Sequence, residues 1–223
     1  MDAETKRKFL AWYAKQGWPV SPWQGKGKPL TAHSFQDATC DWEQISAWNE
    51  SYPDAMWSIR TGTKEEGGAG LVVIDIDKNE EKGVNGFIAW EMLREQFSDP
   101  IETVTVISGG GGKHIYFKYP AGHFIPSGAN VLGAGVDIRA SKGCIYAPPS
   151  VTKAAYFFEV SPTDAEIQDL PAWILERVTS REETAAAPQI EDAPTEKQRG
   201  DKNFVIAQSA LQALHPDLSL IHI

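Results

Sequence analysis

The stretch Val72-Val73-Ile74-Asp75-Ile76-Asp77 decides the fold of this chain. Its β-branched residues predict a buried strand that ends in two carboxylates. Because successive side chains of a strand point to opposite faces, Asp75 and Asp77 share one face. Two carboxylates this close repel each other unless a cation lies between them, and their hard oxygen atoms suit Mg²⁺ or Mn²⁺. A pair of solvated acids in a turn before Lys78-Asn79 is the alternative interpretation.

Helices and strands alternate irregularly on both sides of this strand. The predicted helices are Thr5 to Gln16, Asp41 to Glu50, Val84 to Phe97 and Pro171 to Val178. The predicted strands are Met56 to Thr61, Leu71 to Asp77, Val104 to Ser108, Ile115 to Tyr119, Val136 to Arg139, Cys144 to Ala147 and Tyr156 to Val160. Pro19 to Thr39, which is rich in Pro, Gly and Lys, predicts a loop. This order with several hairpins predicts an α+β domain rather than a parallel doubly wound one.

The length of 223 residues suits one substantial core with a small appendage. We expect the main domain over residues 1–178. Residues 179–200 have the acidic, Pro-bearing composition of a linker. Residues 201–223 regain an apolar period but are too few for a core of their own, so we expect the truncated start of a C-terminal helical module.

The net charge of −9 argues mildly against a nucleic-acid partner. Much of the acidity lies late in the chain, and basic residues gather at Lys26 and Lys28 and around Lys113 and Lys118, so a local basic face is still possible. Lys26, Lys28 and Arg60 are the candidates for template or phosphate contacts. An ordinary solvated face is the alternative for these three residues. Trp23, beside the basic loop, is the candidate for base stacking.

Targeting and cysteine patterns are simple. The start of the chain lacks the apolar stretch of a signal peptide, and no apolar run approaches the roughly 20 residues of a membrane span. We therefore expect a cytoplasmic protein with no membrane partner. Cys40 and Cys144 are far apart and have no metal-ligand spacing, so neither a disulfide framework nor a zinc site is predicted.

A second motif is the glycine-rich turn from Ser108 through Gly109-Gly110-Gly111-Gly112 to Lys113 and His114. Glycines let backbone N–H groups approach phosphates closely, and His114 with Ser108 can donate hydrogen bonds to a triphosphate. Lys113 precedes His114 rather than Ser or Thr, and no helix is expected to follow, so this is not a Walker A loop. A flexible hairpin with a solvent-facing histidine remains the alternative.

A third motif is Gly135-Val136-Asp137-Ile138-Arg139, which continues to Lys142, Gly143 and Ala147-Pro148-Pro149-Ser150. Asp137 and Arg139 share a strand face. The pair is either a plain salt bridge or a metal ligand beside a phosphate clamp, because Arg suits bidentate phosphate binding.

Taken together and in this order, the three motifs resemble the archaeo-eukaryotic primase superfamily, specifically the bifunctional primase-polymerase domain of plasmid and phage replication proteins. The similarity covers roughly Gly17 to Val178. The resemblance implies an α+β catalytic domain with an RRM-like mixed sheet flanked by helices. It also implies a DNA primase and DNA polymerase in which Asp75, Asp77 and Asp137 hold two Mg²⁺ or Mn²⁺ ions.

The same resemblance implies the partners. His114, Arg139, Ser108, Lys113 and Lys142 would bind an NTP or dNTP, and a single-stranded DNA template would follow the basic residues. A helicase domain or protein would come after this chain. Two other functions stay open: a metal-dependent nuclease or phosphodiesterase, and a non-catalytic nucleic-acid-binding module.

Overall fold

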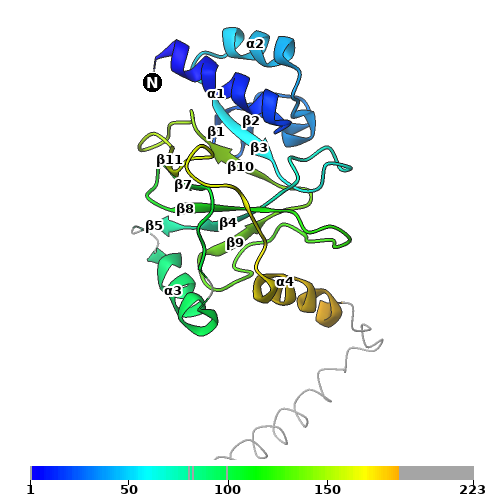
Figure 1. Cartoon of the computed structure of the whole chain (residues 1–223). Coiled ribbons are helices and arrows are strands. Elements are labelled where there is room, and N and C mark those ends of the chain that lie inside the picture. Colours follow the sequence, from blue (N-terminus) through cyan, green and yellow to red (C-terminus); the bar gives the residue numbers. More distant parts are fainter. Residues whose placement is uncertain (1, 80, 82, 99, 186–223) are drawn as a thin grey trace, which may run out of the picture. The chain divides into compact units, whose positions relative to one another are not determined.

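The computed structural model describes residues 2–79, 81, 83–98 and 100–185 (Figure 1). One compact unit spans Met1–Glu183. The mixture of helices with largely antiparallel strands confirms the predicted α+β class. Most of the predicted linker and the whole of the predicted helical module lie outside the described residues. No helix in the described part of the chain has both the length and the apolar character needed to cross a membrane.

A six-stranded sheet carries the strand quoted above. Its strands are β4 (Leu71–Ile76), β7 (Thr105–Ile107), β8 (Lys113–Lys118), β9 (Val136–Arg139), β11 (Phe157–Val160) and β12 (Gln168–Asp169). The order is β11-β7-β8-β4-β9, and β12 pairs with β8 in parallel, so the sheet is mixed. β4 is thus an interior strand, with antiparallel neighbours β8 and β9.

A second sheet of four strands lies above the first in Figure 1, with α1 and α2 on its outer side. It contains β1 (Val20–Gly25), β2 (Lys28–Pro29), β3 (Met56–Arg60) and β10 (Cys144–Ala147), in the order β10-β3-β1-β2. The helices are α1 (Ala3–Gln16) and α2 (Trp42–Ser51), and a 3₁₀ turn, η1 (Ser34–Asp37), precedes α2. Leu10, Tyr13 and Ile45 from these helices pack with Trp57 and Ile59 of β3.

The two faces of β4 belong to two separate apolar cores. Val72, Ile74 and Ile76 pack under α3 (Gly86–Phe97) and α4 (Ala172–Ala185). Leu71 and Val73 pack toward the four-stranded sheet. Both faces are therefore covered, which explains the continuous apolar run of this strand. Asp75 and Asp77 continue the face of Leu71 and Val73, so they point toward the four-stranded sheet and away from α3 and α4.

The remaining elements are short. A small hairpin of β5 (Lys78–Asn79) and β6 (Val84–Asn85) joins β4 to α3. The strand predicted over Ile115 to Tyr119 begins at Lys113. α4 continues to Ala185, so this helix is longer than predicted and occupies the first residues of the predicted linker.

Two sequence predictions are wrong in this region. Pro19 to Thr39 is not a loop throughout, because it contains β1 and β2. Trp23, predicted as a candidate for base stacking, is only 5% exposed, and its Nε1 donates to the hydroxyl of Ser58 at 2.7 Å. A ring buried in this way cannot stack on a nucleotide base.

Candidate active site

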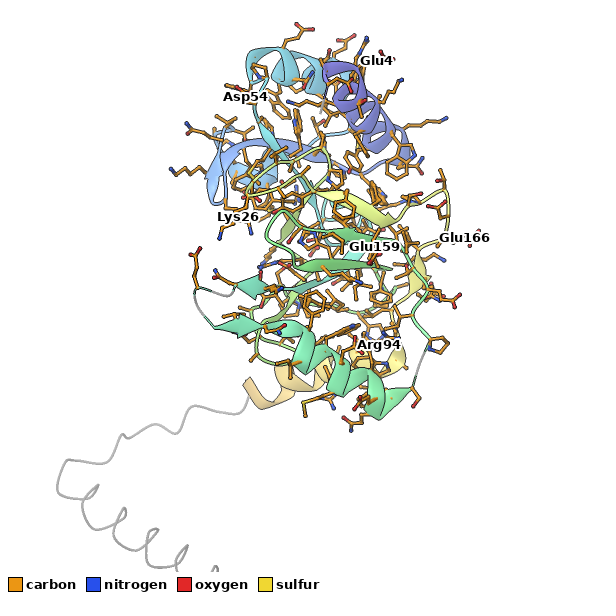
Figure 2. All side chains as sticks on the ribbon, turned by 90° about the vertical axis from the view of Figure 1, so that its left-hand side faces the viewer. Glu4, Lys26, Asp54, Arg94, Glu159 and Glu166 are labelled. Carbon is orange, nitrogen blue, oxygen red and sulfur yellow. The ribbon has the colours of Figure 1, made fainter. Side chains whose placement is uncertain are left out.

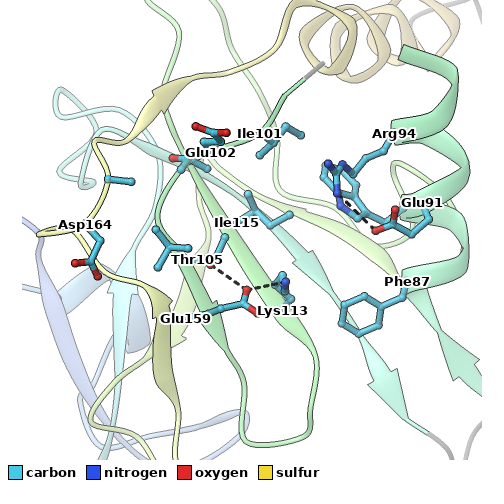
Figure 3. A pocket seen from close by; sticks show the side chains of 14 residues that line it. Phe87, Glu91, Arg94, Ile101, Glu102, Thr105, Lys113, Ile115, Glu159 and Asp164 are labelled. Carbon is cyan, nitrogen blue, oxygen red and sulfur yellow. Dashed lines mark hydrogen bonds and ion pairs between the residues drawn. The ribbon is translucent and has the colours of Figure 1, made fainter. Parts of the chain in front are cut away.

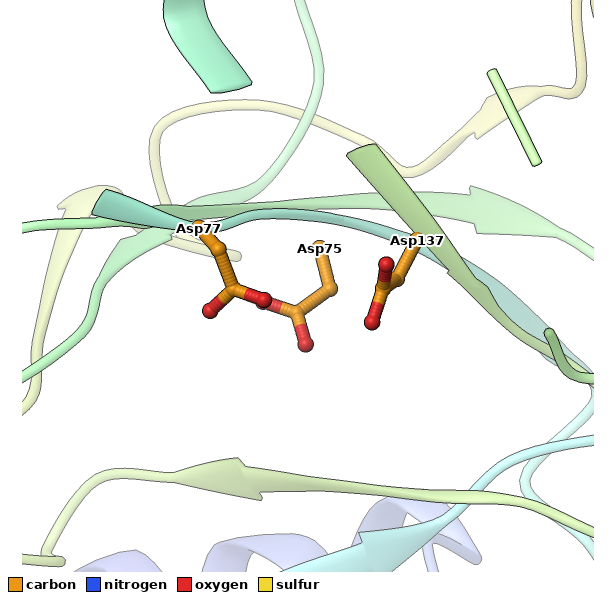
Figure 4. A group of neighbouring side chains, drawn as sticks. All are labelled: Asp75, Asp77 and Asp137. Carbon is orange, nitrogen blue, oxygen red and sulfur yellow. The ribbon is translucent and has the colours of Figure 1, made fainter. Parts of the chain in front are cut away.

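Three carboxylates converge on the face of the six-stranded sheet that is turned toward the four-stranded sheet (Figure 4). Asp75 of β4 lies directly opposite Asp137 of β9 in the strand register, and Asp77 follows β4 on the same side. One oxygen of each acid lies within 4.8 Å of the others. Asp75 and Asp137 are buried, whereas Asp77 is more open. The structure thus brings together the three acids that the sequence singled out.

The backbone of Asp77 is held between two glycines. Its N–H donates to the carbonyl of Gly135, and its own carbonyl accepts the N–H of Gly86, each at 2.8 Å. A Cβ on Gly86 would lie only 2.1 Å from the Gly135 carbonyl oxygen. Only glycine allows this close approach, so the start of α3 fixes the position of Asp77.

Arg139 lies against the two buried acids. Its Nη2 donates to Asp137 Oδ2 at 2.8 Å and to Asp75 Oδ2 at 3.2 Å, and its Nε is 3.3 Å from the same Asp75 oxygen. On the other side of Asp75, His114 Nε2 lies 3.4 Å from Oδ1. His114 stands opposite Asp75 in the β4–β8 register, which places it on the same face.

The electrostatics of the site follow from this crowding. Burial raises the pKa of Asp77, and the charges of Asp75 and Asp137 raise it further. Burial lowers the pKa of His114, although Asp75 opposes the shift, so the imidazole is neutral at neutral pH. The three carboxylate charges exceed the charges of Arg139 and the nearby Lys26, so the cluster attracts a cation.

The glycine-rich turn joins β7 to β8 beside this cluster. Its backbone closes through Ser108 N–H to Gly112 carbonyl at 2.9 Å, and the Ser108 hydroxyl accepts the Gly112 N–H at 3.1 Å. Gly109 packs against the backbone at Ala154, where a Cβ would lie 2.2 Å from the carbonyl oxygen. Ser108 therefore closes the turn, and its predicted contact with a phosphate stays a prediction.

A cleft of about 600 Å³ opens beside Asp77. Its lining is rich in lysine and includes Lys26, Lys78, Lys153, Thr152 and Gly110. Lys26 stands in the β1–β2 turn, between the N-terminal helices and the β5 hairpin in the view of Figure 2. That turn is held by the Gly27 N–H, which donates to the Tyr146 hydroxyl of β10 at 3.0 Å. Among the predicted basic residues, Lys26 is thus the one placed beside the acids.

Lys113 is not brought to this site. It is paired with Ile76 in the register, so strand alternation turns it to the opposite face from His114. There it lines a groove between α3 and the sheet and forms an ion pair with Glu159 at 2.6 Å (Figure 3). We therefore leave Lys113 out of the proposed nucleotide site.

The other predicted cations have mixed placements. Arg60 is engaged with backbone carbonyls, those of Gln36 and Glu66, so its guanidinium holds a loop rather than facing the acids. Lys28 is exposed on β2. Lys142 is exposed in the turn between β9 and β10, where its φ is 56°.

Asn130 is a site residue that the sequence did not single out. Its backbone N–H donates to Asp137 Oδ1 at 2.8 Å, and its side-chain oxygen accepts the Gly135 N–H at 2.7 Å. It therefore positions both Asp137 and the glycine that holds Asp77. The only signal in the sequence was an Asn in a Gly-containing turn, a residue that tolerates its φ of 54°.

The donor set fits a hard divalent cation. Three carboxylates offer oxygen ligands from two adjacent strands, which suits Mg²⁺ or Mn²⁺ better than a softer metal. Neither cysteine belongs to the cluster.

The comparison with family models identifies the class of protein. Residues 10–173 match the model described as bifunctional DNA primase/polymerase, N-terminal. The match covers well over half of the chain, including all three acids, so the chain belongs to this family. Membership implies nucleotidyltransferase activity of the primase/polymerase type, with DNA and nucleotides as substrates. A comparison with curated proteins found no match.

Proposed function

We propose that this domain catalyses template-directed nucleotidyl transfer, as the DNA primase and polymerase of a plasmid- or phage-type replication protein. The convergence of Asp75, Asp77 and Asp137 carries the proposal. These residues would hold two Mg²⁺ or Mn²⁺ ions. When bound, such ions stabilise charge on the α-phosphate and the leaving pyrophosphate and activate the primer 3′-hydroxyl.

The other residues act on the incoming nucleotide. Arg139 presents a planar fork of donors that matches phosphate oxygens. His114, neutral because burial lowers its pKa, donates a single hydrogen bond without adding charge. Ser108 and Lys142 are further candidates near the triphosphate. These fixed donors supply electrostatic stabilisation, which phosphoryl-type transfer needs more than covalent help.

The template would lie along the lysine-rich side of the cleft. Lys26 lines it together with Asp77, and the exposed Lys28 of β2 would add a further template contact. Arg60 would contribute through the loop that it holds. The negative net charge is consistent with this arrangement, because phosphate contacts need only a local basic face. A helicase domain or protein is the partner that we propose to follow this domain in the chain, and the cytoplasm is its proposed location.

DNA synthesis in vitro tests the proposal. The parent chain is given labelled nucleotides and Mn²⁺ on primed and unprimed single-stranded DNA, beside Asp75→Asn and the control Asp169→Asn. Asp169 is an exposed acid on β12, away from the site. Product from the parent and the control, but not from Asp75→Asn, supports the proposal, and unprimed product adds primase activity. Degradation of the DNA favours a nuclease instead, and binding without product favours a non-catalytic module.

A further inference from the structure

Arg139 occupies the carboxylate oxygens that face a cation site. Its Nη2 contacts Oδ2 of both Asp75 and Asp137. The other oxygen of each acid also has a partner, since Asp75 Oδ1 lies 3.4 Å from His114 and Asp137 Oδ1 accepts the Asn130 N–H. The Asp77 carboxylate, by contrast, accepts no hydrogen bond from any described residue. The site therefore holds its own counterion.

A guanidinium and a divalent cation cannot share these oxygens without strong repulsion. Arg139 carries a permanent charge, so it cannot make room by losing a proton. Its side chain remains 32% exposed, however, and lies at the rim of the cluster rather than sealed beneath it. It can therefore swing away from Asp75 and Asp137 without unpacking either apolar core.

We propose that Arg139 is an internal counterion that must leave Asp75 and Asp137 for a divalent cation to bind, and that the triphosphate of the nucleotide is its second partner. This inference rests on the proposed function, because it takes the three acids as the metal site. Arg139 then couples the two ligands. A cation displaces it toward phosphate, and a phosphate that binds it frees the carboxylates. By linkage, each ligand strengthens the binding of the other.

Mn²⁺ binding in the absence of DNA tests the coupling. Free Mn²⁺ is titrated by electron paramagnetic resonance against the parent, Arg139→Gln and Lys118→Gln, with and without a non-hydrolysable dNTP. Lys118→Gln removes the same charge from an exposed side chain that is paired with Asp169 at the far end of β8, so it controls for net charge.

Without nucleotide, Arg139→Gln should bind Mn²⁺ about tenfold more tightly than the parent, because charge-assisted hydrogen bonds of this kind no longer compete. Lys118→Gln should match the parent. The nucleotide should tighten Mn²⁺ binding in the parent and much less in Arg139→Gln. Arg139→Lys keeps the charge but loses the planar set of guanidinium donors, so its Mn²⁺ affinity should lie between those of the parent and Arg139→Gln. It replaces Arg139→Gln in the test if that variant folds poorly.

The opposite result overturns the inference. If Arg139 only props the acids in place, Arg139→Gln will bind Mn²⁺ equally or more weakly, and the nucleotide effect will be unchanged. If neither the parent nor the variant binds Mn²⁺ even with nucleotide, the metal site itself fails, and the proposed function with it. The two failures are therefore distinguishable.

Discussion

Replacing Asp77 with asparagine should stabilise the metal-free protein while it abolishes synthesis. The Asp77 carboxylate accepts no hydrogen bond from the described residues, so the change removes none. What it removes is an unfavourable charge, because burial, and then the charges of Asp75 and Asp137, raise the pKa of Asp77. The backbone bonds of Asp77 to Gly86 and Gly135 do not involve the side chain and should persist.

The magnitude follows from the spacing of the charges. At 4.8 Å, the outer limit for the cluster, two like charges repel by about 1 kcal/mol in water and about 3.5 kcal/mol at an effective dielectric constant of about 20. Lys26 and Arg139 offset much of this repulsion, and Asp77 is only half-buried, so no more than the lower value applies, and the relieved burial of the charge adds to it. We expect a gain of about 1 kcal/mol, or about 2–4 °C in Tm.

The assay is thermal unfolding in EDTA at several pH values. Because the folded-state pKa of Asp77 is raised above 3.8, its repulsion is fully present above the raised pKa and disappears as the pH falls toward 3.8. The advantage of Asp77→Asn should therefore be full at pH 7 and lost in acid. Added Mn²⁺ should raise the Tm of the parent more than that of the variant. An unchanged or lower Tm in EDTA at pH 7, with Asp169→Asn matching the parent, would refute the reasoning.

Three further predictions address the supporting residues. Gly86→Ala should lower the free energy of unfolding by about 1–3 kcal/mol and reduce Mn²⁺ binding, because its Cβ would meet backbone at 2.1 Å. The control Gly25→Ala, whose Cβ meets open space, should change that free energy by less than about 0.5 kcal/mol in the same denaturant melts. Burial lowers the folded-state pKa of His114 below 6.5, so the Tm of the parent should fall as the pH drops through 6.5. His114→Asn should make the Tm depend less on pH in melts between pH 7.5 and 5. An equal dependence in the two proteins would contradict the burial of a neutral His114. In steady-state extension, Lys113→Gln should leave the KM for dNTP unchanged, and Arg139→Gln should raise it about tenfold or more. Equal effects would mean that Lys113 is wrongly assigned to the face of the sheet opposite the acids.

The acid strand was predictable from sequence because its pattern obeys one rule. Alternation placed Asp75 and Asp77 together, and β4 has that arrangement with both faces covered. The same rule places Lys113 and His114 on opposite faces of their strand. Lys113 was predicted to bind the nucleotide because the glycine-rich motif was interpreted as a whole, without applying the alternation to its last two residues. The contact of Arg139 with Asp75 depends on the pairing of β9 with β4, which no local pattern specifies.

The N-terminal sheet was harder to predict. Pro22 lacks the N–H that a strand interior needs and so argued against β1. The strand that contains Pro22 nevertheless forms. It pairs with β3 along four residues, and its other neighbour, β2, is only two residues long. Trp23 next to Lys26 suggested an exposed platform, but the buried hydroxyls of Ser21 and Ser58 satisfy its N–H inside the core. Ser21 is only two residues from Trp23, but Ser58 is distant in sequence, and its place beside the indole becomes visible only in the fold.

The most direct test of the central claim is anomalous diffraction from crystals of this domain grown with Mn²⁺ and a non-hydrolysable dNTP. We predict manganese peaks about 2 Å from oxygens of Asp75, Asp77 and Asp137, with the triphosphate beside Arg139 and His114. A nucleotide bound elsewhere, or no manganese at the three acids with Arg139 still bridging Asp75 and Asp137, would contradict it.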